Sequence, residues 1–181
     1  MSKRVQISKN DSVTFSSRIY KDIFTILEKE ALSKNISINS LVNTILGKYV
    51  TLERHANDIE LVSLTKRSII QIFSQMEEKT IKQIAKDVGG VVHKELVFLK
   101  FGEMSFDNLM HVLVVNASRY GTVKYDFDDL YHNICIHHGS CLEFSKFLAQ
   151  VHENMAQHLS VNIVITNTDQ NTLCMKIHEQ K

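Results

Sequence analysis

Apolar and polar residues alternate one by one near the start of the chain. The apolar positions are Val13, Phe15 and Ile19, and the polar positions between them are Thr14, Ser16 and Arg18. A period of two places successive side chains on opposite faces, which is typical of a half-buried β-strand. We therefore predict a strand over 13–19.

The period changes after this segment. Ile23, Leu27 and Ala31 recur in steps of four, which predicts a helix over 21–34. Ser37 is a favourable N-cap for a second helix. That helix carries an apolar stripe, which consists of Leu41, Val42, Ile45, Leu46, Tyr49 and Val50. The first 52 residues are thus expected to form a strand, a helix, a short turn and a helix.

These three elements cannot enclose a core alone. About 50 residues lie at the lower edge of independent stability, and a lone strand leaves its backbone donors and acceptors unpaired. The economical solution is a homodimer in which two strands pair antiparallel and four helices cover their apolar face.

The next segment, 53–90, is expected to be a helical connector that also contributes to dimerisation. Its apolar residues suggest one or two helices, and Val62, Ile69 and Met76 are spaced by seven, as in a short coiled-coil seam. Gly89 and Gly90 provide a helix stop.

The segment 91–181 predicts an α/β domain with two hairpins and two helices. Strands are expected over 96–101, 123–127, 131–136, 161–165 and 173–177, and a helix over 106–119. A capping-box pattern, Ser140-x-x-Glu143, predicts the start of the other helix. The fold class is therefore α+β, with segments 1–52, 53–90 and 91–181.

Charge is distributed unevenly along the chain, whose net charge is +1. Residues 1–50 hold eight Lys and Arg against four Asp and Glu, a balance of +4, whereas residues 51–181 hold thirteen against sixteen, a balance of −3. A basic segment 1–50 joined to a mildly acidic segment 51–181 indicates an anionic partner for residues 1–50.

Several classes of protein find no support in the composition. There is no run of about 18 apolar residues and no signal-peptide pattern, so we expect neither a membrane span nor secretion. The three cysteines, Cys135, Cys141 and Cys174, have no framework spacing, which favours reduced thiols and a cytoplasmic location. No glycine-rich phosphate loop or catalytic string occurs, and we predict that the protein is not an enzyme.

Residues 11–50 resemble the ribbon-helix-helix, or Arc-repressor-like, superfamily of DNA-binding proteins. The resemblance is carried by the strand that ends in Ser16-Ser17-Arg18-Ile19, by the helix from Lys21, and by the turn Ser37-Ile38-Asn39-Ser40. The family often has a proline directly after the strand, where this chain has Tyr20. The resemblance implies an intertwined dimer whose two-stranded ribbon enters the major groove of double-stranded DNA.

The resemblance also implies which residues contact DNA. Thr14, Ser16 and Arg18 would face the base edges, and Arg18 would bind guanine through two hydrogen bonds. The phosphate contacts would come from the start of the second helix and from a basic arm, which are Ser37, Ile38 and Asn39, and Lys3, Arg4 and Lys9, respectively.

A cluster of histidines and cysteines lies in the last segment, from His132 to Cys141. Imidazole and thiolate are ligands for transition metals, and the candidates for one site are Cys135, His137 and Cys141. The alternative is that Cys135 is a small core residue and the histidines have structural roles. No cofactor is firmly predicted; a transition metal or haem stays an open alternative.

The sequence thus predicts a homodimeric, or higher even-numbered, transcriptional regulator. Its last domain would sense an effector, for instance a small molecule, or assemble oligomers. Two alternatives are a metal- or haem-binding sensor that uses the His132–Cys141 cluster, and an antitoxin-like protein that binds a protein partner. No membrane partner is expected.

Overall fold

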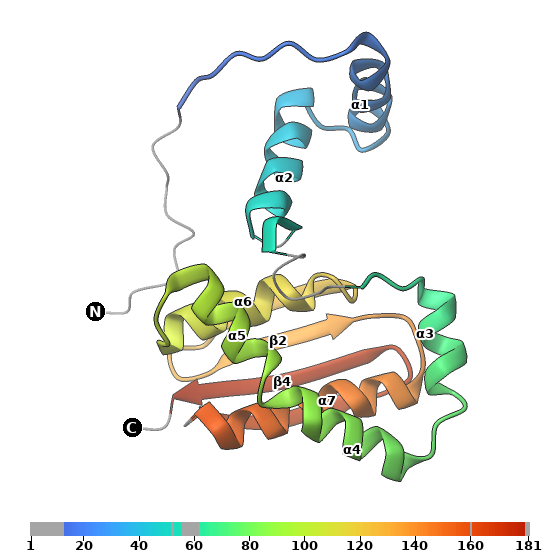
Figure 1. Ribbon diagram of the computed structural model, residues 1–181, viewed down its shortest axis with the longest axis vertical. Coiled ribbons are helices and arrows are strands. Elements are labelled where there is room, and N and C mark those ends of the chain that lie inside the picture. Colours follow the sequence, from blue (N-terminus) through green and yellow to red (C-terminus); the bar gives the residue numbers. More distant parts are fainter. Residues whose placement is uncertain (1–12, 52, 56–61, 160, 180–181) are drawn as a thin grey trace. The chain divides into compact units, whose positions relative to one another are not determined.

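The computed structural model describes residues 13–51, 53–55, 62–159 and 161–179. They form an α+β protein with an antiparallel four-stranded sheet. The elements, in chain order (Figure 1), are α1 (Lys21–Ser33), α2 (Ile38–Thr51), the 3₁₀ turn η1 (Glu53–His55), α3 (Lys66–Phe73), α4 (Glu78–Gly89), α5 (Val92–Phe101), α6 (Phe106–Ala117), β1 (Thr122–Phe127), β2 (His132–His137), α7 (Leu142–Leu159), β3 (Val161–Thr168) and β4 (Thr172–Glu179).

The chain divides into two units between residues 56 and 57. The first contains α1 and α2, and the second contains α3 to α7 and the sheet. The helices predicted over 21–34 and after Ser37 are confirmed as α1 and α2. The strand predicted over 13–19 is not present in this single chain, where residues 13–20 have no regular secondary structure.

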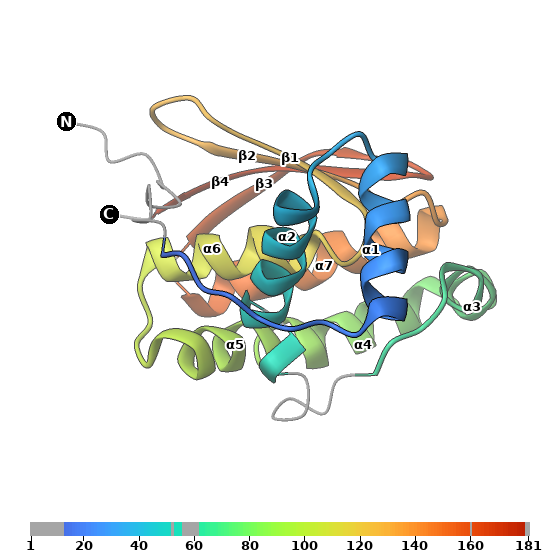
Figure 2. The same ribbon diagram turned by 90° about the horizontal axis from the view of Figure 1, so that it is seen from above.

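The sheet of the second unit has the order β1-β2-β4-β3. The two predicted hairpins, β1–β2 and β3–β4, are confirmed, and the ladder between β2 and β4 joins them into one sheet. The inward side chains of β2 and β4, such as Ile134, Leu173 and Met175, are buried in the core. Figure 2 shows the helices of this unit on one side of the sheet only.

The helices of the second unit form two layers beneath the sheet. α7 contacts β3 and β4, and α4 and α5 pack against α7 and α6. Gly89 allows the close approach of α4 to α7, because a Cβ atom there would lie 2.6 Å from the Val151 carbonyl oxygen. Phe144 and Leu148 on α7 belong to the same core as the inward face of the sheet.

The prediction of a strand over 96–101 is wrong, since these residues lie in α5. Its buried residues, His93, Leu96 and Val97, follow helical spacing, whereas Phe98 and Leu99 are exposed. A short apolar run looks the same in a buried strand and in a helix. The last segment therefore has three helices instead of two.

The segment 53–90 is also not a separate connector over its described part. Ile69 and Phe73 of α3 pack against the core of the second unit, and the Phe73 ring lies 5.1 Å from that of Phe144. No continuous helix carries the predicted heptad, because Val62 precedes α3 and Met76 lies between α3 and α4. None of the described helices has the length and apolar composition that a bilayer span requires.

Candidate nucleic-acid interface

The eight described residues before α1, 13–20, are all exposed. They include the three predicted base-reading residues, Thr14, Ser16 and Arg18, and also the apolar Val13 and Phe15, which are 87% and 67% exposed. A strand needs a second backbone to pair with, and among the described residues of this chain none pairs with this segment. The ribbon is therefore not formed within one chain.

The two helices of the first unit leave most of their apolar side chains uncovered. Of the described hydrophobic residues in this unit, only Ala31 and Leu41 are buried. The exposed ones on the helices and the turn are Ile23, Phe24, Ile26, Leu32, Ile36, Ile45, Leu46, Tyr49 and Val50. This number of exposed apolar side chains on two short helices is typical of an interface.

A defined turn connects α1 to α2. Asn35 has a positive φ of 53°, the left-handed conformation that asparagine tolerates. The Ile36 N–H donates to the Ala31 carbonyl at 3.0 Å and the Asn35 N–H to that of Leu32 at 3.1 Å, which together make a Schellman end to α1. The exit direction of the chain is thereby fixed immediately before α2.

Ser37 forms the N-cap that the sequence predicts. Its Oγ accepts the Ser40 N–H at 3.1 Å, and its carbonyl accepts the Leu41 N–H at 3.0 Å. The N–H groups of Ile38 and Asn39, in the first turn of α2, have no intrahelical acceptor by helix geometry. They point along the positive end of the helix dipole, where a phosphate is favoured. Three of the predicted phosphate-binding residues thus lie together, whereas Lys3, Arg4 and Lys9 lie outside the described residues.

The candidate metal ligands are not brought together. Cys135 and His137 lie on the sheet face that points away from the helices, because their neighbours in β2 are the inward, buried residues. Cys141 is instead buried in the core. No group of three or more His, Cys, Asp or Glu side chains in the described parts of the chain is placed to hold a metal ion.

The expectation of three reduced thiols is also wrong. Cys135 and Cys174 form a disulfide, and Cys141 is a free cysteine. The register of β2 and β4 places the two bonded residues directly opposite each other. Sequence alone did not suggest this pair, since the two positions are separated by 39 residues and only the sheet register makes them neighbours.

Two buried histidines, which the sequence analysis did not select, face each other between α5 and α7. The rings of His93 and His152 are 5.5 Å apart. Burial and the neighbouring His152 lower the pKa of His93 to about 3, and burial lowers the pKa of His152. The His152 Nδ1–H donates to the Leu148 carbonyl at 2.6 Å, whereas the buried Nδ1 of His93 has no hydrogen-bond partner. Both imidazoles are therefore neutral near pH 7.

A third buried histidine, His132, lies in an aromatic environment near one end of the sheet. Its Nδ1 is 2.7 Å from the Tyr125 hydroxyl, and its ring contacts those of Phe106 and Phe127. Burial lowers the pKa of His132 and raises that of Tyr125. The neutral His132 imidazole accepts a hydrogen bond from the Tyr125 hydroxyl, so both groups have a partner. The role of this pair is structural.

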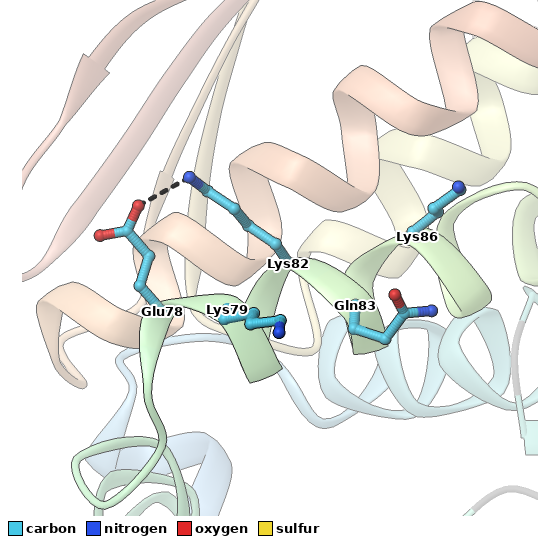
Figure 3. Close-up of a pocket in the computed structure, with 5 residues that line it drawn as sticks. All are labelled: Glu78, Lys79, Lys82, Gln83 and Lys86. Atoms are coloured by element: carbon cyan, nitrogen blue, oxygen red, sulfur yellow. Dashed lines mark ion pairs between the residues drawn. The ribbon is translucent and has the colours of Figure 1, made fainter.

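The exposed side of α4 carries a shallow, positively charged groove. Figure 3 shows its lining residues, Glu78, Lys79, Lys82, Gln83 and Lys86. The Lys82 Nζ lies 2.7 Å from the Glu78 Oε1, and the Lys146 Nζ lies 3.5 Å from Oε2 of the same carboxylate. The groove follows one helix and is open to solvent, so it resembles a charged helix surface more than an enclosed ligand site.

Comparison with known proteins gives no family. No family model and no curated protein matches the chain. Among solved structures, that of an H-NOX protein from Shewanella woodyi, with IWP-051 bound and in the Fe(II)CO ligation state, aligns over 96% of this chain and 78% of that chain. The sequence identity is 12% and the TM-score is 0.27. A superposition as loose as this one establishes no common fold, and the chain is assigned to no family.

Proposed function

We propose that the protein is a sequence-specific DNA-binding transcriptional regulator that acts as a homodimer. The observation that carries this proposal is the composition of the first unit, where an exposed segment of alternating character precedes two helices with an uncovered apolar side. This is the arrangement that one half of a ribbon-helix-helix dimer would have without its partner. Such a function belongs in the compartment that holds DNA, the cytoplasm of a prokaryotic cell.

A second copy of the chain fits the uncovered surface best. An interface around a two-fold axis uses the same patch on both subunits, and an alternating segment can pair with its own symmetry mate. Val13, Phe15 and Ile19 would then turn toward the four helices, and their burial at roughly 25 cal/mol per Å² would favour the dimer. The polar side chains would be left on the outside of the ribbon.

The outward side chains fit the major groove, which admits a two-stranded ribbon. Arg18 would donate to O6 and N7 of a guanine, while Thr14 and Ser16 would make shorter hydrogen bonds to bases. The N–H groups of Ile38 and Asn39 would bind a phosphate beside the groove. Two symmetric copies would bind a roughly palindromic site.

The second unit would supply regulation or assembly. An effector changes DNA binding only if it binds two states of the dimer unequally. No specific observation favours the metal- or haem-sensor alternative, since Cys135, His137 and Cys141 are not grouped. None favours the antitoxin-like alternative either, since the described residues 62–179 form a packed unit.

The proposal is tested by measuring duplex-DNA binding across a salt series. Log affinity should fall linearly with log salt as phosphates are neutralised. Arg18→Ala should weaken binding by about 1–3 kcal/mol and flatten sequence preference. Arg67→Ala, which removes an exposed arginine from α3 in the second unit, is the matched control and should leave binding unchanged. An absence of salt-dependent DNA binding by the wild type would contradict the proposal.

A further inference from the structure

The cross-strand disulfide lies on an open surface of the second unit. Cys135 and Cys174 are opposite each other in β2 and β4 and alternate with the buried inward residues of these strands. They therefore lie on the sheet face that the helices of this unit do not cover (Figure 2). Both residues are partly exposed, whereas the inward residues beside them, such as Ile134 and Met175, are buried. An external thiol therefore has access to this disulfide without unfolding of the core.

The disulfide is not needed to set the strand pairing. The β2–β4 ladder continues on both sides of it, from His132 opposite Ile177 to His137 opposite Thr172. Buried inward residues fix the same register, because a slip by one residue would turn them to the solvent. The two thiols would thus stay opposite each other after reduction, which is what reversible formation of the bond requires.

The two sulfur atoms have different neighbours. Lys124 of β1 lies directly opposite Cys135, and its side chain projects from the same face. The neighbour of Cys174 on its other side is Asn167 of β3, which carries no charge. Lys176, two residues along β4 on the same face, has its Nζ over the Tyr131 ring, 5.4 Å from the ring centroid. A nearby ammonium lowers the pKa of a thiol, and a thiol of lower pKa leaves faster in exchange reactions.

The geometry points to a reversible thiol–disulfide exchange site in which an external thiol attacks Cys174 and Cys135 is the leaving group. In the first step a thiolate forms a bond to the Cys174 Sγ, the bond between the two cysteines breaks, and its electron pair stays on Cys135 as a thiolate. In the second step another thiolate attacks the small-molecule sulfur of the mixed disulfide. The small disulfide leaves, Cys174 is released as a thiolate, and the two protein thiolates take up protons according to their pKa values.

A role in redox sensing rests on the DNA-binding function proposed above, because disulfides of intracellular proteins are usually transient, catalytic or redox-sensing. The exchange reaction itself does not depend on that function. Its test uses no DNA, so a failure of the exchange site and a failure of DNA binding are distinguishable.

The test is a reaction of the oxidised full-length protein with glutathione under native conditions, stopped with acid and analysed by peptide mass spectrometry. We expect the mixed disulfide on Cys174, two alkylatable thiols after excess reductant, and no labelling of the buried Cys141 before unfolding. Lys124→Gln should slow formation of the adduct severalfold, because it raises the pKa of the leaving thiol. Lys79→Gln, with the same loss of charge on α4, should not.

Three results would overturn the inference. They are a disulfide that resists glutathione until urea unfolds the protein, an adduct that forms mainly on Cys135, and aerobically purified protein in which both thiols are already free. Cys135→Ser provides a second check, since it should leave Cys174 open to alkylation without any reductant. Circular dichroism would verify that this variant is folded.

Discussion

The imidazole Nε2 of His138 lies 2.7 Å from the Ser145 hydroxyl and joins the end of β2 to α7. The Ser140 N–H donates to Nδ1 of the same ring at 3.1 Å, so the proton of the neutral imidazole is on Nε2. Nε2–H therefore donates to Ser145, whose hydroxyl donates in turn to the Asp169 carbonyl at 2.5 Å. This direction is opposite to the one that activates a serine nucleophile, and the chain of bonds fastens the β3–β4 turn to α7.

Ser145→Ala should therefore destabilise the second unit by about 1–3 kcal/mol, because it leaves the buried His138 donor without a partner. Urea unfolding followed by circular dichroism measures this change. Ser118→Ala removes an exposed hydroxyl that bonds only within its own helix end, and its effect should stay within about 0.5 kcal/mol. Equal stabilities of the two variants would show that the His138–Ser145 bond contributes nothing.

The stability of the second unit should decrease in mild acid. The pKa of His93 is about 3 in the folded protein against 6.5 for the free side chain, so the unfolded chain binds a proton that the folded chain does not. The contribution of His93 to the free energy of unfolding is fully present above pH 6.5 and is lost as the pH falls toward 3. Between pH 7 and pH 5 the loss should be about 2 kcal/mol.

Urea unfolding at pH 7 and pH 5 measures this loss, and His93→Gln supplies the comparison. The variant is less stable at both pH values but should show a pH dependence that is smaller by about 2 kcal/mol, since glutamine does not titrate. Other histidines whose pKa values are also lowered by burial contribute to the pH dependence of the variant, namely His111, His132, His138 and His152. An identical pH dependence in the two proteins would show that His93 is not buried in neutral form.

Substitutions of two neighbouring residues, Phe15 and Thr14, should distinguish an effect on dimerisation from an effect on DNA binding. Phe15→Asp places a charge on the apolar side of the predicted ribbon and should dissociate the homodimer and abolish DNA binding together. Thr14→Asp places the same charge on the outer side and should keep the dimer while repelling phosphates. Analytical ultracentrifugation and duplex binding measure the two properties. A monomeric wild type, or a dimeric Phe15→Asp variant, would contradict the proposed ribbon.

Removal of the disulfide should lower stability without changing the fold. The bond links residues 39 apart in sequence, and loop-closure entropy for that length corresponds to about 4 kcal/mol. The Cys135→Ser/Cys174→Ser double variant should therefore unfold at lower urea concentration by up to that free energy. Its midpoint should match that of wild type with reductant and should itself be insensitive to reductant. A reductant-sensitive double variant would point to another source of the effect.

Local patterns predicted the elements whose signals are contained in a few consecutive residues. The N-cap at Ser37 was confirmed because capping needs only Ser37 and Ser40, and the two hairpins because alternation and turn residues are local. The start of α7 was missed by one step. Ser140 does not cap this helix, since its Oγ donates to the His138 carbonyl. The Ser145 N–H donates to the Cys141 carbonyl, and the helix begins at Leu142.

Residues 13–20 show what a local pattern does not determine, namely whether a segment finds a strand to pair with. Alternation predicted a strand, and its polar and apolar residues are fixed by the sequence, but a strand exists only when a second backbone supplies hydrogen bonds. In the single chain the segment is exposed and unpaired. Its assignment as a DNA-reading ribbon stays a prediction that the dimerisation and binding experiments decide.

The sequence by itself determined the helices of the first unit, the hairpins, and the polar and apolar sides of each, because periodicity and capping are properties of neighbouring residues. Only the tertiary structure decided that α3 and α4 pack into the second unit, that 96–101 is helical, and that Cys135 is bonded to Cys174 while Cys141 is buried elsewhere. These features depend on which distant segments share a core or a strand register. The pattern of polar and apolar residues around a position does not indicate which distant residue that position contacts.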